Sequence, residues 1–380
     1  MRITAMKRPA VLLLLLAVAA FPPGARASGT AEGRNGGFTS TAACMDCHSS
    51  SNARYAVLGA KARYEHSGHK LIGDAAYANG TGCQKCHTNE GFIAFTQKGE
   101  PDPKDFVADP SQPGCFTCHM PHEKGDFSLR TVAPVKLENG KIFDVGNGNL
   151  CATCHRATAE ASKAVAPMPA NKILPFWGSH HGPQADIVMG TNAYEFPGKT
   201  YGSSAHKDIM NDGCVSCHMS LPKGRAGLSL EIGGHSFSIE GDVHEVDTLN
   251  VSACISCHRD AAQVPGKNVF NLIAQEDYDH NGKKEPYQVE VQGLLDRFVN
   301  KGGTGLLQKL NPPFYKPDGS FNFVRSDAVR PLVEVAGFYN YRMISDDRSR
   351  GIHNTKYVIQ VLYDTIQSLD PEFDVGLRPQ

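Results

Sequence analysis

The sequence lacks the features that anchor a chain in a bilayer or attach it to nucleic acid. Its one apolar stretch, residues 10–21, is too short for a membrane span, and no later segment is apolar for long enough. Basic and acidic residues are nearly balanced, at 38 and 39, and no basic block is present. We therefore expect no transmembrane segment and no nucleic-acid partner.

The short apolar stretch has the features of a secretory signal. Basic residues lie within the first eight positions, and Ala25 and Ala27 fit the small-residue cleavage pattern. We expect residues 1–27 to be a signal peptide and the mature chain to start near Ser28. Export predicts a periplasmic location, or one on the outer cell surface.

Cysteine is absent outside one repeated pattern. All twelve cysteines belong to six copies of Cys-x-x-Cys-His, the attachment signature of c-type haem. The two thiols bond covalently to the porphyrin, and the adjacent imidazole becomes an axial ligand of the iron. The sequence thus predicts six haem c groups. The motifs are Cys44, Cys47 and His48; Cys83, Cys86 and His87; Cys115, Cys118 and His119; Cys151, Cys154 and His155; Cys214, Cys217 and His218; and Cys254, Cys257 and His258.

Other uses of paired cysteines fit this pattern less well. Zinc sites need four ligands but no histidine directly after the second cysteine. A disulfide framework would show irregular spacing, and a thioredoxin-like motif would occur once, at the start of a helix.

The length of the chain limits how much protein can surround each haem. Removing 27 residues from 380 leaves 353, or about 59 for each of six haems, so the porphyrins must supply much of the buried apolar surface. We therefore expect a mainly α fold with extensive loops, organised around six stacked haems and low in regular secondary structure.

The motifs divide the chain into three regions. Residues 28–165 carry four motifs, residues 166–265 carry two motifs and are rich in further histidines, and residues 266–380 carry none. The last region has helical periodicity over residues 287–301 and 331–344. Asn354 is positioned to cap a final helix, whose apolar stripe runs from Val358 to Leu369. These helices are expected to pack on each other and to cover haem edges.

Ten histidines lie outside the motifs, enough to give every iron a second axial imidazole. Three of them follow a serine by two residues, and another follows Gly233-Gly234, where small residues allow close approach to a flat ring. His66 and His180 compete with neighbouring candidates, His244 is a reserve, and His280 is not expected to bind iron. The six favoured distal ligands are His69, His122, His181, His206, His235 and His353.

A short acidic segment matches the first half of a calcium-binding loop. Oxygen-bearing side chains alternate along it before a glycine turn, but position twelve is Gln288 instead of the usual glutamate, and Glu290 follows two residues later. Calcium binding and a solvated acidic turn both remain open interpretations. The candidate ligands are Asp277, Asp279, Asn281 and Lys283.

Several segments give the chain a family resemblance. It resembles the periplasmic and outer-surface multihaem cytochromes of metal-reducing bacteria. Their haem packing is related to that of the tetrahaem cytochromes of ammonia oxidisers and of the ammonia-forming nitrite reductases. The resemblance implies electron transfer along closely packed haems and supports the distal assignments. The matching segments are His181-Gly-Pro-Gln-Ala-Asp, Ser204-Ala-His206 leading to Cys214, Gly-Gly-His235-Ser-Phe, the Asp277 loop and Gly351-Ile-His353-Asn354.

The chain departs from the nitrite reductases at the motif that binds the catalytic haem. Those enzymes typically carry a haem motif ending in lysine, whereas all six motifs here end in histidine. This difference argues against nitrite reduction. Because the histidines suffice to give all six irons a second imidazole, we predict an electron carrier with bis-histidine haems instead of an enzyme. Its partners would be other redox proteins or an extracellular or periplasmic electron acceptor. The alternatives are a reductase with one open five-coordinate haem, acting on a small nitrogen or sulfur compound, and a subunit of an oligomeric cytochrome filament.

Overall fold

The computed structural model describes residues 57–71, 83–99, 107, 109–124, 126–209 and 211–380. The predicted signal peptide and the first motif, Cys44, Cys47 and His48, lie outside the described residues. In the described ranges fifteen α-helices are present, and each strand has two or three residues. The expectation of a mainly helical fold with little regular structure is therefore confirmed for this part of the chain.

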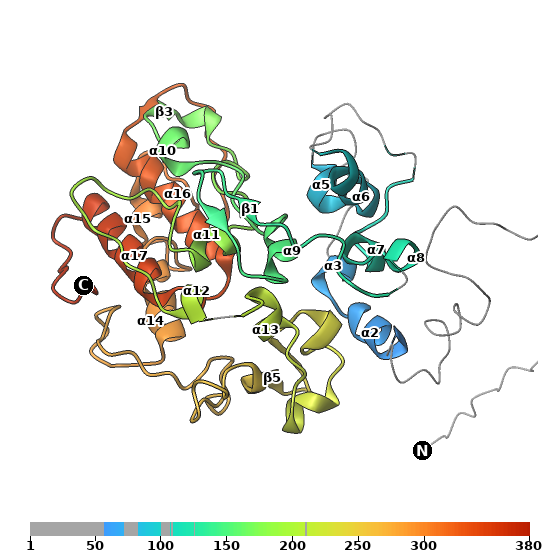
Figure 1. Cartoon of the computed structure of the whole chain (residues 1–380). Helices are drawn as coiled ribbons and strands as arrows, with labels where there is room; N and C mark the ends of the chain where they lie inside the picture. Colours follow the sequence, from blue (N-terminus) through green and yellow to red (C-terminus); the bar gives the residue numbers. More distant parts are fainter. Residues whose placement is uncertain (1–56, 72–82, 100–106, 108, 125, 210) are drawn as a thin grey trace, which may run out of the picture.

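The region that carries the motifs is built from short helices joined by long loops. In Figure 1 its first helices lie on the right, and α9 and α13 lie between them and the C-terminal helices. The α-helices are α2 (Val57–Tyr64), α3 (Gly68–Leu71), α5 (Gln84–His87), α6 (Asn89–Lys98), α7 (Cys115–Cys118), α8 (Pro121–Lys124), α9 (Gly148–Ala152), α10 (Ala161–Ala164), α11 (Gln184–Val188), α12 (His206–Ile209) and α13 (Cys214–His218).

Four short 3₁₀ helices and three small antiparallel sheets complete this region. Two sheets join neighbouring segments, whereas β3 pairs with the distant β6 and so ties residue 168 to residue 330. The 3₁₀ helices are η1 (Ala170–Lys172), η2 (Gly224–Leu228), η3 (Gly234–Ser236) and η4 (Val251–Ala253). The strand pairs are β1 (Val135–Lys136) with β2 (Ile142–Phe143), β3 (Met168–Pro169) with β6 (Val329–Arg330), and β4 (Glu240–Asp242) with β5 (Asp247–Leu249).

The C-terminal region forms the main hydrophobic core. Its helices are α14 (Tyr287–Asp296), α15 (Leu306–Lys309), α16 (Leu332–Asp347) and α17 (Thr355–Leu369), and α17 packs against both α14 and α16. Phe338 of α16 and Leu362 of α17 are fully buried in one cluster with Leu294 of α14. Segments from residues 161–201 also reach this cluster, so the core holds the middle of the chain as well as its end.

The predicted apolar stripes and the predicted cap are found in this core. The Asn354 side chain accepts a hydrogen bond from the Tyr357 amide and so caps α17, as predicted. Helix α16 begins directly after Pro331 and runs three residues beyond the predicted end. Helix α14 ends five residues early, because the amides of Phe298 and Val299 both bond to the Leu295 carbonyl and tighten the last turn.

Candidate haem sites

We number the motifs as sites 1 to 6 in chain order, and the structure describes sites 2 to 6. Each of these motifs lies on a helical turn. At site 4 the His155 amide donates to the Cys151 carbonyl at 2.8 Å, and at site 6 the His258 amide donates to the Cys254 carbonyl at 2.8 Å. Residues four apart lie on one face of a helix, so the turn directs a thiol and the imidazole to the same side. The spacing therefore suits attachment and ligation of one planar cofactor.

Every described proximal histidine ring lies beside a second histidine ring from elsewhere in the chain. The partners come from α3, α12, the loop before α11, the η3 turn and the turn before α17. The ring centroids are 6.1 Å apart for His87 and His180 at site 2, 6.3 Å for His119 and His235 at site 3, 5.9 Å for His155 and His69 at site 4, 6.2 Å for His218 and His353 at site 5, and 6.1 Å for His258 and His206 at site 6.

These separations fit one iron between each pair of rings. Two imidazole nitrogens bonded to one metal at about 2 Å lie about 4 Å apart, which places the ring centres about 6 Å apart. The five measured separations span 5.9 to 6.3 Å. Each of the five described motifs therefore has a histidine pair with the spacing that bis-histidine ligation of one iron would need.

Hydrogen bonds at Nδ1 fix the orientation of four of the ten paired rings. The Nδ1 of His206 donates to the Ile352 carbonyl at 2.9 Å, and the Nδ1 of His218 donates to the Phe237 carbonyl at 2.8 Å. His155 lies 3.2 Å from the Gln184 amide oxygen in the same way. A proton held on Nδ1 leaves the Nε2 lone pair for a metal.

The fourth of these rings has a charged partner. The Nδ1 of His353 lies 2.6 Å from Oδ1 of Asp347, which is the last residue of α16. Burial alone would lower the pKa of His353, but the Asp347 carboxylate outweighs it and raises that pKa. Burial also lowers the pKa of His69, to about 4, with a further contribution from nearby His155. The neutral form that results at His69 is the one that binds iron.

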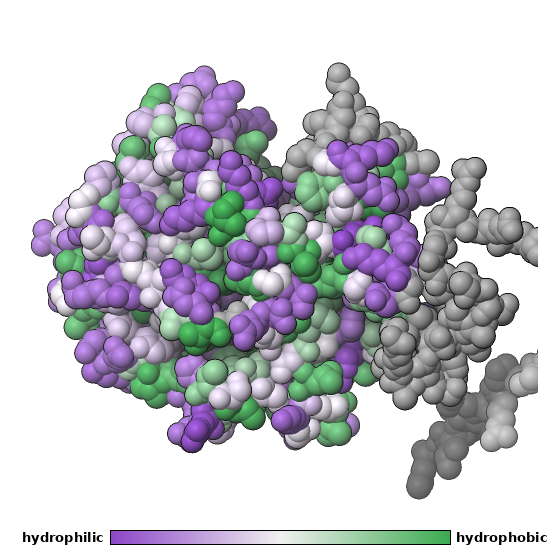
Figure 2. Space-filling model, viewed as in Figure 1, coloured by the Kyte–Doolittle hydropathy of each residue, from purple (hydrophilic) through white to green (hydrophobic). Residues whose placement is uncertain are grey.

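Apolar side chains lie beside some of the paired rings and on the surface near the site 5 motif. The Phe237 ring contacts His69 edge-on at 5.2 Å and His235 at 5.9 Å. Figure 2 shows apolar residues gathered over the middle of the face, where α9 and α13 lie in Figure 1. Ile209 and Leu221, which flank the site 5 motif in sequence, are 58% and 68% exposed. Such surfaces suit contact with the flat apolar face of a porphyrin.

Two favoured distal candidates, His181 and His122, are not the ring partners of the five described proximal histidines. His180, not the favoured His181, lies opposite His87, and its backbone has a φ of 64°. The His181 ring instead lies 3.8 Å from the Asp346 carboxylate. His122, on α8, contacts the Phe116 ring at 5.4 Å, while all five described proximal rings have other partners.

Thiols of different motifs lie close together, which shows which sites are neighbours. The Cys154 thiol at site 4 lies beside Cys86 of site 2, and the Cys151 thiol lies beside Cys214 of site 5, and each neighbour raises the pKa of the site 4 thiol that it contacts. Helix α13 also contacts both α9 and η4, which bring site 4 and site 6 beside site 5. Cys118 of site 3 lies near enough to both site 4 thiols to affect their pKa values.

The acidic loop gathers three carboxylates, one of which the alternating pattern does not include. Oxygens of Asp277, Asp279 and Glu290 lie within 4.8 Å of one another. The Asn281 side chain bonds to Asp279, and the Lys283 amide donates to Asn281 Oδ1 at 2.9 Å. Burial raises the pKa of Asp279 and of Glu290. Glu290 projects from α14, so the helix supplies the third carboxylate.

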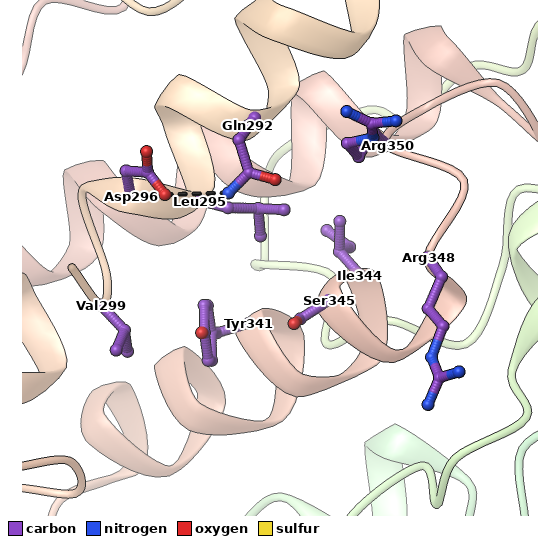
Figure 3. Close-up of a pocket in the computed structure, with 9 residues that line it drawn as sticks. All are labelled: Gln292, Leu295, Asp296, Val299, Tyr341, Ile344, Ser345, Arg348 and Arg350. Carbon is purple, nitrogen blue, oxygen red and sulfur yellow. Dashed lines mark hydrogen bonds between the residues drawn. The ribbon is translucent and has the colours of Figure 1, made fainter. Parts of the chain in front are cut away.

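A cavity of about 210 Å³ lies between α14 and α16 (Figure 3). Two arginines stand at one end of it, and Asp296 lies on the α14 side, where it accepts a hydrogen bond from Gln292. No cysteine or histidine lines it, so it offers no haem attachment. The lining residues are Gln292, Leu295, Asp296, Val299, Tyr341, Ile344, Ser345, Arg348 and Arg350.

Comparisons with known proteins agree with the haem motifs. The chain is similar to the C-type polyheme cytochrome OmcC of Geobacter sulfurreducens, with 22% identity over 251 residues. The match covers 59% of this chain and 30% of OmcC, so the chain spans less than a third of that curated relative. This similarity supports a multihaem c-type cytochrome. No family model matches the chain.

Two solved structures resemble the fold at low sequence identity. Outer cell wall cytochrome OcwA matches with a TM-score of 0.45 and 19% identity, over 81% of this chain and 50% of OcwA. The undecaheme cytochrome from the S-layer of Carboxydothermus ferrireducens matches with a TM-score of 0.44 and 16% identity, over 82% of this chain and 41% of its own. Within the described ranges, no helix is both long and apolar enough to cross a membrane.

Proposed function

We propose that the protein is an exported hexahaem c-type cytochrome that carries electrons between redox partners. The five histidine pairs are the observation that supports this most directly, because each matches one motif. Bound haem would supply the reversible Fe(III)/Fe(II) change. The chain supplies two imidazoles per iron, and a filled coordination sphere leaves no position for a substrate.

The thiol contacts support a specific order of sites. Sites 2, 4, 5 and 6 follow one another, and site 3 lies beside site 4. We propose that electrons move through the protein in this order, with site 4 as the branch point. The external ends of this path would meet other redox proteins or an electron acceptor outside the inner membrane.

Site 1 needs a distal ligand from the remaining histidines. His122 stays our prediction, because its exposed position on α8 lets it serve a haem other than that of nearby His119. His280 is engaged elsewhere, with its Nε2 3.1 Å from the Tyr363 hydroxyl. The other histidines outside the pairs are His66, His181 and His244.

The proposal is tested by counting haems and by electron paramagnetic resonance of the ferric protein. The mass should exceed that of the processed chain by six haem groups, and all the iron should be low-spin. Fewer haems would overturn the hexahaem proposal. A high-spin signal from native iron would favour the reductase alternative.

A pair of adjacent variants tests the ligand assignment at site 2. His180→Gly should convert one of the six irons to high-spin, and glycine suits the backbone there because φ is 64°. His181→Gly is the matched control and should leave all the iron low-spin. The opposite result would return the site 2 assignment to His181.

A further inference from the structure

The end of α16 and the turn that follows it, residues 346–354, reach ligands of three sites. Its His353 is the distal candidate of site 5, and its Ile352 carbonyl accepts the hydrogen bond from His206 of site 6. At the end of α16, the Asp346 and Asp347 carbonyls accept hydrogen bonds from the Gln184 amide, at 3.3 and 3.5 Å. Gln184 in turn contacts His155 of site 4. One short segment therefore orients ligands at three neighbouring sites.

The partners at these three sites differ in charge. His155 of site 4 bonds to a side-chain amide oxygen, and His206 of site 6 and His218 of site 5 bond to backbone carbonyls, so all three have neutral partners. His353 bonds to a carboxylate, and among the ten paired rings of the described chain it has the only such partner within hydrogen-bond distance. The Asp347 side chain is 1% exposed, so water screens this contact weakly.

Neighbouring contacts hold both Asp347 and the segment that carries His353 in place. It is the last residue of α16, and its second carboxylate oxygen accepts a hydrogen bond from the Ser349 hydroxyl. Directly after His353, Asn354 caps α17 and also donates to the Ser203 hydroxyl at 2.8 Å. The carboxylate and the imidazole are therefore both held by the two longest helices of the described chain.

We propose that Asp347 makes site 5 the site of lowest reduction potential among sites 2 to 6. A carboxylate that accepts the Nδ1 proton makes the imidazole a stronger electron donor to iron. The stronger donor and the buried negative charge both stabilise Fe(III) over Fe(II), which lowers the potential. This inference rests on the proposed bis-histidine ligation of site 5 and goes beyond it by assigning the residue that sets the potential.

The order of sites gives this difference a consequence for electron flow. Site 5 lies between site 4 and site 6, so an electron moving from either neighbour must pass through the site that is hardest to reduce. Electrons would therefore collect on two sides, with sites 2, 3 and 4 on one side and site 6 on the other. Asp347 then acts as a positioning residue that divides the chain of haems into two pools.

Asp347→Asn in the holoprotein tests the proposal. Asparagine keeps the shape of the side chain and removes the charge. Spectroelectrochemical titration should show the lowest of the resolved potentials rising, with at least a tenfold gain in the equilibrium constant for reduction of that iron, which is about 59 mV. The near-infrared magnetic circular dichroism of one low-spin iron should change with it, while the haem count stays at six.

Asp346→Asn is the matched control. Asp346 is the preceding carboxylate, is paired with Arg342 at 2.8 Å and makes no hydrogen bond to a paired ring. It should leave the lowest potential unchanged. The proposal is overturned if Asp347→Asn moves no potential, if it moves one that lies above two or more of the others, or if Asp346→Asn shifts the same potential equally.

His353→Gly separates this proposal from the ligation on which it rests. If His353 binds iron, this variant converts one low-spin iron to high-spin and alters the same potential that Asp347→Asn raises. If His353→Gly leaves all the iron low-spin, the ligation itself is wrong. If it creates one high-spin iron while Asp347→Asn changes nothing, the ligation stands and the role of Asp347 is refuted.

Discussion

The region with the haem motifs and the C-terminal region bury apolar surface in different ways. Helices α16 and α17 have 16 and 15 residues and share one large cluster of buried side chains. In the described part of the motif region the longest helix has 10 residues, and its two separate clusters are small. The C-terminal region thus packs around its own side chains, whereas the described motif region buries few of its own, as expected of an interior that haem would complete.

Preventing haem attachment should have the largest effect and should separate the two regions. Chain produced without haem should lose ordered structure at α5, α7 and α13, because their buried partners would be absent, while α14, α16 and α17 keep theirs. Hydrogen exchange should show protected amides only in the C-terminal core and in the segments packed on it. Equal protection of both regions without haem would contradict the comparison.

Removing a large side chain from the core should have a smaller effect than loss of haem, but should still lower the free energy of unfolding by several kcal/mol. Phe338 is fully buried and stacks on Phe314 at 4.7 Å, so Phe338→Ala should lower the free energy of unfolding by about 3–5 kcal/mol. Phe323→Ala is the control, because Phe323 is 66% exposed. Denaturant unfolding followed by far-ultraviolet circular dichroism measures both. Similar losses for the two variants would argue against a self-sufficient core.

Loss of the α17 cap should have a smaller effect, at the junction of the two regions. Asn354→Ala removes the hydrogen bond from the Tyr357 amide and should lower the free energy of unfolding by about 1–2 kcal/mol. Asn147→Ala is the matched control, since Asn147 precedes α9 as an N-cap without a side-chain capping bond. Its effect should stay within about 0.5 kcal/mol. Equal effects in thermal unfolding would mean that the Asn354 cap contributes no stability.

Calcium binding should have the smallest effect on stability, and this effect should be confined to the C-terminal region. If Asp277, Asp279 and Glu290 bind Ca²⁺, a concentration equal to Kd should raise Tm by about 1–2 °C. Asp279→Asn should abolish the rise, and Mg²⁺ at the same concentration should give less of it. No response of Tm to Ca²⁺ across a wide concentration range would favour the solvated acidic turn.

The sequence predicted features that depend on neighbouring residues better than those that depend on distant ones. The Asn354 cap and the apolar stripe of α17 follow from residues within one helix, and the structure confirms both. The end of α14 was less predictable, because two amides share one carbonyl and close the helix before the glycines. The third carboxylate of the acidic loop comes from Glu290 in the following helix, outside the alternating pattern.

Which histidines pair with one another was the feature hardest to predict from the sequence. His69 and His155 meet across a long stretch of chain, and nothing in either segment specifies the other. At residues 180 and 181 the serine spacing favoured the second histidine, but a left-handed backbone at His180 directs the first one toward His87. The contact between Asp347 and His353 has one signal in the sequence, a carboxylate six residues before a histidine. That pattern is too common to predict a contact.

The position of His353 also bears on how the protein is assembled. Synthesis proceeds from the N-terminus, so His218 on α13 is made well before its partner, which lies in the turn before α17. Under the proposed ligation, the iron at this site would keep one imidazole and an open face, able to react with oxygen or carbon monoxide, until the turn before α17 is in place. Folding of the C-terminal helices would then complete the site and protect it from small-molecule attack.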